Sequence, residues 1–246
     1  MSNRARVIWR SIGLGITAAL LIAAVIWGYR MQPTDAACVS LRYTIEDRSE
    51  RLYLTEQELD LLLQSKDLYP VGKKMDIVSL HRIEETVLHH PMVRTAECYM
   101  TPRNEMRIRL TQREPLVRVQ TASDTYFIDR DRKVMPVRKA VRDSVLLVKG
   151  TVGVQIASGV LADFAEWLED NSYWRKRVHH VHVASPQMVY IYLKGEQPRI
   201  VMGNMRGYEK KLAKLRVFFE KGAEAIQDKN YTELDLRFKG QVIGRY

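Results

Sequence analysis

The sequence predicts an α+β protein with one N-terminal transmembrane helix followed by two domains outside the membrane. Three observations support this prediction: an uninterrupted apolar stretch near the N-terminus, apolar residues that then recur with the period of a strand or of a helix, and turn residues between these segments. We expect a cytoplasmic tail over residues 1–10, a membrane helix over 11–29, a first domain over 38–113 and a second domain over 114–246.

The N-terminal apolar segment is long enough to cross a membrane. Residues 11–29 contain no charged side chain, and about twenty apolar residues at roughly 1.5 Å each span a hydrocarbon core of about 30 Å. Trp9, Trp27 and Tyr29 flank the segment, where amphipathic rings favour the headgroup region. A cleavable signal peptide is the alternative, because Ala36 and its neighbours are small. The length of the apolar run favours an uncleaved anchor.

Arginines set the predicted orientation of this anchor. Arg4, Arg6 and Arg10 precede it and only Arg30 follows it closely, so the positive-inside rule places the N-terminus in the cytoplasm and the two domains outside. The formal net charge of +10 is typical of nucleic-acid binding, but a domain outside the cytoplasm meets little nucleic acid. Anionic lipid headgroups, cell-wall polymers or an acidic protein are better candidate partners, and a solvated basic surface is the simplest interpretation.

The chain has two cysteines, Cys38 and Cys98. They are able to pair in an oxidising compartment, but two cysteines are too few for a disulfide framework. The sequence leaves their pairing open.

The first domain begins with a predicted strand and a predicted helix. Residues 38–46 alternate apolar and polar side chains, as a half-buried strand does. Thr55 and Glu58 have the spacing of a capping box, which predicts the start of an amphipathic helix. The apolar face of this helix consists of Leu59, Leu62 and Leu63.

A second helix and two strands complete the first domain. We expect the helix to begin at Asp76 as its N-cap and to end before Pro91, because the residue before a proline disfavours helical geometry. Its apolar residues are Ile77, Leu80, Ile83 and Val87. Residues 92–100 and 105–112 then alternate as strands do, which gives the order strand, helix, helix, strand, strand.

The second domain is richer in strands. The predicted strands lie in residues 116–121, 125–129, 133–137, 145–150, 177–183, 188–194 and 198–203. Residues 129–132 predict a tight turn, since aspartate accepts local backbone hydrogen bonds. A helix over 159–171 buries Leu161, Phe164 and Leu168, and a basic helix over 208–226 carries Leu212, Leu215 and Phe219 on one side.

An ordered set of short motifs resembles the FtsQ/DivIB family of bacterial cell-division proteins over nearly the whole chain. The motifs are Ile83-Glu84-Glu85, His90-Pro91-Met92-Val93, the Pro102 turn, Gln112-Arg113-Glu114-Pro115, Tyr126-Phe127-Ile128-Asp129 and Leu234-Asp235-Leu236-Arg237-Phe238. The resemblance implies that the first module is a POTRA domain. Met92 departs from the aromatic residue often found there, and the usual glycine of the hairpin turn near Arg132 is replaced.

The resemblance implies a non-enzymatic scaffold of the divisome, without cofactor, metal or small-molecule substrate. It also implies a single-pass protein of the bacterial cytoplasmic (inner) membrane at the division septum, with the bulk of the chain in the periplasm. The implied partners are small bitopic proteins of the FtsB and FtsL type, together with other divisome membrane proteins.

In the family, a partner segment adds to the edge formed by the last strands of the second domain. This mode is physically reasonable, because an exposed edge strand offers backbone donors and acceptors that an extended segment can pair. By position, the implied partner-binding residues are Phe238, Lys239, Gly240, Gln241 and Val242, with Tyr231, Arg206, Lys210 and Arg216 as flanking candidates. The alternative is that Phe238 and Val242 are simply buried, Gly240 only makes a bend and the basic helix is solvated.

A metal-dependent hydrolase is the main rival hypothesis, motivated by two histidine-rich segments. His81, Glu85 and His89 share one face of the predicted helix, but His81 and His89 are two turns apart, about 12 Å along the axis and too far for one ion. Glu85 and His89 remain a possible chelating pair, although the segment 81–90 matches neither the HExxH nor the HxxEH zinc pattern. Glu84 lies next to the apolar stripe of this helix, and the sequence offers no reason for it.

His180 and His182, in the segment 179–182, share one face of a predicted strand and make a better metal pair. No third ligand or activating carboxylate is evident, so a surface strand is the favoured interpretation. A GxSxG nucleophile motif is absent from the sequence, and Cys98 in a predicted strand resembles a structural thiol. A POTRA-type chaperone of polypeptide transport is a third alternative, but such proteins commonly carry several of these modules.

Overall fold

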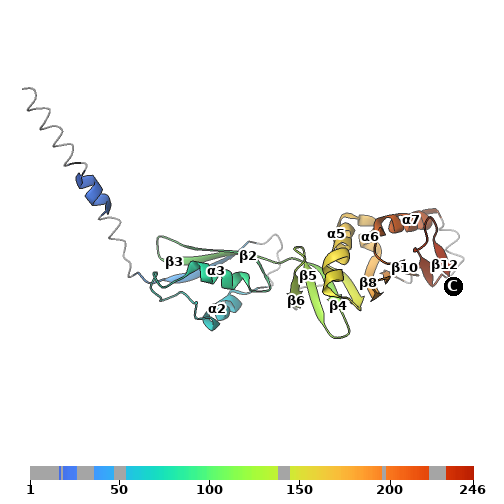
Figure 1. The fold of residues 1–246 in the computed structure, drawn as a ribbon, viewed down its shortest axis with the longest axis horizontal. Helices are drawn as coiled ribbons and strands as arrows, with labels where there is room; N and C mark the ends of the chain where they lie inside the picture. The colour runs from blue at the N-terminus through green and yellow to red at the C-terminus, as the bar shows by residue number, and fades with distance from the viewer. Residues whose placement is uncertain are drawn as a thin grey trace, which may run out of the picture.

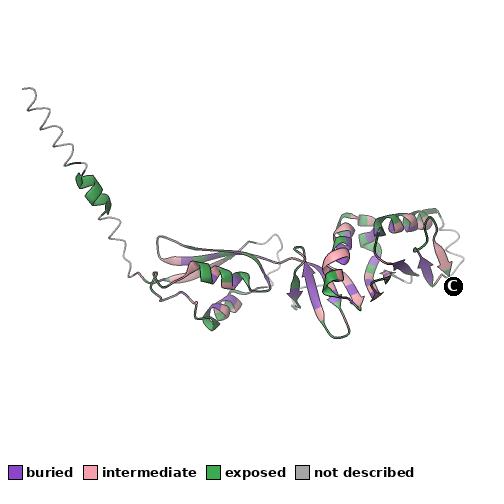
Figure 2. Ribbon diagram, viewed as in Figure 1, coloured by how far each residue is buried: buried purple, intermediate pink, exposed green. Residues whose placement is uncertain are grey.

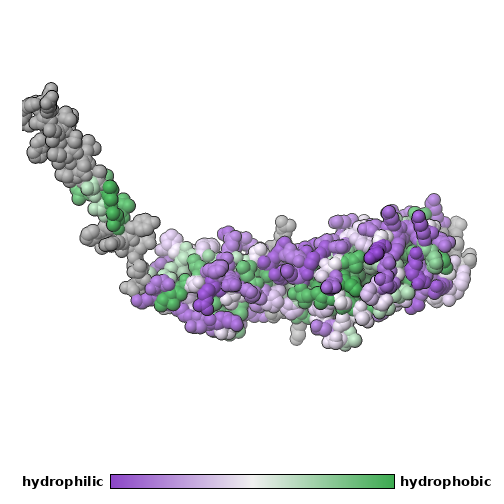
Figure 3. All heavy atoms as spheres, in the orientation of Figure 1, coloured by the Kyte–Doolittle hydropathy of each residue, from purple (hydrophilic) through white to green (hydrophobic). Residues whose placement is uncertain are grey.

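The computed structural model describes residues 17, 19–26, 36–46, 54–137, 145–195, 198–221 and 231–246. The predicted tail over residues 1–10 and much of the predicted span over 11–29 lie outside these residues. The described part of that span is helical, apolar and exposed (Figure 3). In the part of the chain that is described, no helix has the length and apolar character needed to cross a bilayer.

The first domain is a three-stranded sheet packed against two helices (Figure 1). Its strands are β1 (Ser40–Ile45), β2 (Val93–Met100) and β3 (Glu105–Gln112), and its helices are α2 (Glu56–Ser65) and α3 (Leu80–Leu88). The sheet order is β1-β3-β2, with β1 parallel and β2 antiparallel to the central β3. The predicted order of strand, helix, helix, strand, strand is confirmed.

The two helices of this domain begin at side-chain caps. Glu58 N donates to Thr55 Oγ1 over 3.3 Å, and Thr55 N donates to Glu58 Oε2 over 3.2 Å, which confirms the predicted capping box. The predicted start of the second helix at Asp76 is wrong. Ser79 is the N-cap, and its Oγ accepts from Arg82 N over 3.4 Å. Ile77 therefore precedes the helix and is 68 % exposed. Its helical spacing relative to the later apolar residues is coincidental.

Glu84 ties helix α3 to the edge of the sheet. Its Oε2 accepts a hydrogen bond from Cys98 N over 2.9 Å. Because β2 is an end strand of the sheet formed by the described residues, that N–H meets no neighbouring strand there, and the Glu84 carboxylate satisfies it. Burial, with a smaller effect of the nearby Glu84 charge, raises the pKa of the Cys98 thiol to about 12. Both Cys38 and Cys98 are free thiols in the structure.

The second domain contains a nine-stranded sheet in the order β12-β11-β10-β9-β8-β7-β4-β5-β6. Its strands are β4 (Pro115–Gln120), β5 (Thr125–Asp129), β6 (Val134–Pro136), β7 (Leu146–Gly150), β8 (Val178–Ser185), β9 (Met188–Leu193), β10 (Arg199–Gly203), β11 (Glu233–Asp235) and β12 (Ile243–Arg245). Its helices are α4 (Val154–Ile156), η1 (Ala157–Leu161), α5 (Ala162–Asp170), α6 (Ser172–Arg177) and α7 (Tyr208–Lys221). This arrangement confirms a mixed domain that is rich in strands.

Helices α5, α6 and α7 lie along one side of the sheet, and the domain core lies between them and the strands (Figures 1 and 2). The buried members include all but one of the predicted helix residues: Leu161, Phe164, Leu168, Leu212 and Leu215. Phe219 is only partly buried and packs against the same core. Burying apolar area at roughly 25 cal/mol per Å² is what holds these helices on the sheet.

The two domains meet at the hairpin formed by β5 and β6. Phe127 and Met135 of this hairpin belong to the hydrophobic cluster of the first domain. Asp129, 1 % exposed, accepts a hydrogen bond from Arg113 Nη1 over 2.7 Å. Its other oxygen accepts from Lys133 N over 2.6 Å. The junction is therefore a continuous packed region with a buried ion pair.

The predicted turn at residues 129–132 is confirmed. Arg132 N donates to Asp129 O over 3.0 Å, and Arg132 has a φ of 65°, in the left-handed region that favours glycine. The Arg132 guanidinium reaches Asp163 and Glu166 of α5 at 2.9 and 2.8 Å. These ion pairs offset the conformational cost of placing a non-glycine residue there.

The buried pair predicts unequal effects of two similar substitutions. We expect Asp129→Asn to lower the free energy of unfolding by about 1.5–3 kcal/mol, because it weakens charge-assisted hydrogen bonds of a buried group. Asp131→Asn removes a charge from the exposed pair with Arg94, which measures 2.7 Å, and should cost at most about 1 kcal/mol. Urea unfolding of the full-length variants measures both values. Equal losses would contradict a special role for the buried pair.

Candidate partner-binding site at the C-terminal edge

Strand β12 forms one end of the nine-stranded sheet. It pairs antiparallel with β11, which in turn runs parallel to β10. The opposite end strand, β6, belongs to the hairpin that faces the first domain. In the described part of the chain, the outer side of β12 has no strand partner. It therefore offers the backbone groups that strand addition requires.

Residues between β11 and β12 form a turn that Lys214 of α7 holds. The Lys214 ammonium donates to the carbonyl oxygens of Phe238 and Gln241, both over 2.6 Å, and to that of Leu236 over 3.3 Å. An ammonium has three N–H donors, so these contacts use its full capacity. Burial lowers the pKa of Lys214, and the charge of Asp235 opposes that effect. Helix α7 thus fixes the course of the chain into the edge strand.

Two buried acids hold the hairpin to its neighbours. Asp235 is fully buried and lies 2.6 Å from Arg237 Nη2. Glu233 is bound by Arg199 of β10 at 2.7 Å and by Arg245 of β12 at 3.1 Å. Burial alone would raise the pKa of Asp235, but its hydrogen bonds with Arg237 and the charge of Arg245 outweigh burial and lower that pKa. Ion pairs therefore reinforce two short strands that form few ladder hydrogen bonds.

Aromatic rings pack against strand β12 at Gly244. Tyr231 stacks on Tyr246 with ring centroids 5.0 Å apart. Gly244 lies directly under the Tyr231 ring, and a Cβ at this position would collide with it. Glycine is needed here so that the ring can approach the backbone of β12 closely.

The predicted partner-binding residues fall into two groups. Four lie in the turn before β12, and one directly precedes the strand. Phe238 to Gln241 lie in the turn, where Gly240 has a φ of 76°. Phe238 is 43 % exposed, and Lys239 and Gln241 are also exposed. Val242, just before β12, is half-buried and packs against the domain core. The predicted binding residues thus precede the end strand β12 and do not belong to it. Their role in binding stays a prediction.

The flanking candidates lie at different places. Arg206 lies in the loop before α7, where its backbone N–H donates to Asn204 Oδ1 over 3.2 Å. Lys210 is exposed on α7. Arg216 pairs with Glu220 at 2.7 Å and covers the ring of Tyr173 in α6, so it is engaged with neighbouring helices. Sequence reasoning missed Lys214, because nothing in a basic helix distinguishes the lysine that meets a turn more than twenty residues later.

The helical histidines of the rival metal hypothesis do not converge. His89 Nδ1 contacts the backbone oxygen of Glu85 at 2.7 Å, and His90 Nδ1 accepts from Met92 N over 3.3 Å. His81 is exposed. These contacts are local backbone interactions at the end of α3 and do not form a chelate.

The strand histidines interact mainly with rings. His180 Nδ1 lies 2.8 Å from His179 Nδ1, and the His180 ring stacks on Tyr192 with centroids 4.5 Å apart. Burial, followed by the charges of His179, Lys149 and His182, lowers the pKa of His180 to about 4. Across the described residues there is no group of three or more His, Cys, Asp or Glu side chains placed to hold a metal ion.

Comparison with known families gives two matches. The model described as FtsQ/DivIB, C-terminal related, matches residues 114–245, and the model described as POTRA-like domain matches residues 36–111. A search among curated proteins finds no match.

The two matches follow the chain in the same order as the two domains of the structure. The FtsQ/DivIB match spans more than half of the 246 residues, and it includes the whole terminal hairpin. The POTRA-like match covers the β-α-α-β-β module except for Gln112, the last residue of β3. The chain therefore belongs to the FtsQ/DivIB family of bacterial cell-division proteins.

Proposed function

We propose that this protein is a divisome scaffold that binds small bitopic division proteins of the FtsB and FtsL type by β-strand addition at β12. Family membership itself indicates a scaffold role in cell division at the septum, and families of this kind are generally non-enzymatic. The identity of the partners, the anchoring of the N-terminus in the inner membrane and the periplasmic placement of both domains are parts of the proposal.

The observation that carries the proposal is the position of β12 at the end of the sheet. An added strand forms backbone hydrogen bonds with the edge, and side chains at alternate positions supply specificity. The edge is ordered in advance by Lys214 and by the pairs of Glu233 and Asp235. A preorganised edge loses less conformational entropy on binding, which increases affinity.

The charges around the edge favour a partner segment with acidic flanks. Arg245 and Lys239 are exposed beside the strand and the turn, and both acids of the hairpin are buried beneath arginines. Phe238 adds an exposed ring next to the same turn. An extended segment with an apolar residue and nearby carboxylates complements this surface.

Charged and truncating substitutions at the edge test the proposal. We expect Val242→Glu to weaken binding of an FtsB-like extramembrane segment by about tenfold or more, because it places a charge where the added strand enters. Phe238→Ala should weaken it by a smaller factor. Titration calorimetry with full-length protein measures both effects.

Val134→Glu provides the matched control, because Val134 is an exposed valine of β6 at the opposite end of the sheet. It should leave binding unchanged. If Val242→Glu keeps the native circular dichroism spectrum and still binds with the original affinity, strand addition at β12 is wrong. An equal loss for Val134→Glu would point to a non-specific charge effect.

The lowered pKa of Asp235 predicts how pH acts on the hairpin. A carboxylate with a folded-state pKa below its ordinary value of 3.8 stabilises the fold fully above that value, and this contribution is lost as pH falls through the lower folded-state pKa. The stability gap between wild type and Asp235→Asn should be largest at neutral pH and close below about pH 4. Urea unfolding followed by the fluorescence of Trp167 and Trp174 measures the gap. A gap that widens with acid would contradict the assigned direction.

Depletion of the protein in cells tests the wider role. A divisome scaffold is required for septum formation, so depleted cells should grow into filaments without septa. Expression of the wild-type chain should restore division, and Val242→Glu should restore it less well than Val134→Glu. Normal septation after full depletion would contradict an essential role in division.

A further inference from the structure

A cavity of about 590 Å³ lies in the second domain and shares no residue with the terminal hairpin. Its walls come from β4, β5, β7, β8, α5 and α6, and from Lys194 just after β9. Its volume falls within the roughly 300–1,000 Å³ typical of ligand sites. The proposed strand addition at β12 leaves this cavity without a role.

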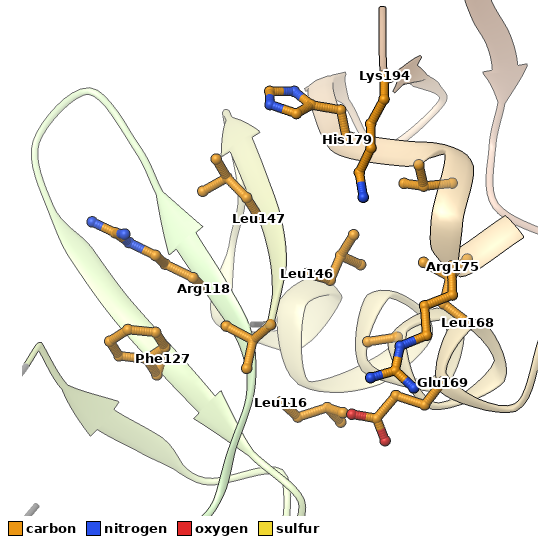
Figure 4. Close-up of a pocket in the computed structure, with 13 residues that line it drawn as sticks. Leu116, Arg118, Phe127, Leu146, Leu147, Leu168, Glu169, Arg175, His179 and Lys194 are labelled. Carbon is orange, nitrogen blue, oxygen red and sulfur yellow. The ribbon is translucent and has the colours of Figure 1, made fainter. Parts of the chain in front are cut away.

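The inner wall of the cavity is apolar. Leu116 and Leu168 are almost fully buried in it, whereas Leu146 is half-buried and lies in its middle (Figure 4). Leu147, the next residue of β7, points to the opposite face of the strand, on the side of Arg118. A half-buried leucine at the centre of a cavity leaves apolar surface in contact with water. Covering that surface would be favourable by roughly 25 cal/mol per Å².

The mouth of the cavity is cationic. In Figure 4, Lys194 extends toward the middle of the cavity from one side, with His179 beside it, and Arg175 runs along the other side toward Glu169. Arg118 also belongs to the lining but points away. Within the described residues, neither the Arg175 nor the Lys194 side chain has an ion-pair partner. Their charges are available to a ligand.

The acid in the lining does not neutralise these cations. Glu169 is bound by Arg130 Nη2, with its two oxygens at 2.9 and 3.2 Å. Residues 138–144, which precede Val145 of the lining, lie outside the described residues. By sequence they carry three basic residues and one acid, and residues 196–197, which follow Lys194 closely and are also not described, carry one acid. Among the described residues that line the cavity, Glu169 is the one acid, so a carboxylate of another molecule can pair with Arg175 and Lys194.

We propose that this cavity binds an acidic segment of a protein partner, with an aliphatic side chain inserted against Leu146 and flanking carboxylates paired with Arg175 and Lys194. The apolar wall selects the side chain, and the cations select its neighbours in the segment. A small inorganic anion would use the cations but leave the apolar wall exposed to water. The site goes beyond the proposed strand addition and does not depend on it.

Fluorescence anisotropy with the full-length protein tests the proposal. The probe is the amidated pentapeptide Glu-Glu-Leu-Glu-Glu with fluorescein at its N-terminus. Two further peptides carry glutamine in place of every glutamate, or alanine in place of leucine. We expect the acidic leucine peptide to bind about tenfold more tightly than either, because each change removes one of the two complementary contacts. Equal binding of the three peptides would overturn the proposal.

Substitutions on helix α6 locate the binding. Arg175→Glu should weaken the peptide by about tenfold, and adding Lys194→Glu should weaken it further. Lys176→Glu makes the same charge change at the neighbouring residue, which does not line the cavity, and should change affinity by less than about twofold. A loss with Lys176→Glu as large as with Arg175→Glu would show attraction to net charge alone and would overturn the site.

One competition and one variant complete the test. Inorganic phosphate that displaces the peptide more effectively than sodium chloride at equal ionic strength would identify a small-anion site and overturn the proposal. Val242→Glu in the terminal hairpin should leave peptide binding unchanged, since the two sites share no residue. Loss of the peptide with this variant would place binding at the hairpin and would also overturn the cavity site.

Discussion

The buried ion pair between Arg113 and Asp129 fixes how the two domains pack against each other. It holds the β5–β6 hairpin against the first domain, where Phe127 and Met135 join the neighbouring core. One end of the nine-stranded sheet is thereby directed toward the first domain. The other end, β12, lies at the far end of the molecule with the C-terminus (Figure 1). Sheets that expose an edge risk non-specific pairing, so an ordered, short and charged edge is the expected solution.

Order at that edge comes from side chains more than from the strand ladder. β11 and β12 each have three residues, too few to be stable as an isolated hairpin. Lys214 donates hydrogen bonds to carbonyl oxygens of the turn, and the buried carboxylate of Asp235 forms an ion pair with Arg237. Removing one partner of such a buried group is costly, because the other is left without compensation. The same interactions that stabilise the hairpin therefore define the surface presented to a partner, so stability and binding are coupled there.

The sequence was most informative where structure depends on neighbouring residues. The capping box of Thr55 is local, and so are the alternation of the strands and the turn at 129–132; each is found in the structure. The sequence suggests Asp76 as the cap because Ile77 matches the helical period, whereas the N-cap in the structure is Ser79.

Interactions between distant residues were invisible to such patterns. Glu84 binds a strand fourteen residues later, and Lys214 meets a turn more than twenty residues later, so pattern reasoning could not identify either role. The central claim, strand addition at β12, is tested most directly by hydrogen–deuterium exchange of the full-length protein with and without an FtsB-like segment. The account predicts slower exchange of backbone amides in Ile243–Arg245 on binding, with no change at the amides of Val134 and Met135 in β6. Protection confined to other elements, with β12 amides exchanging as fast as in the free protein, would contradict it.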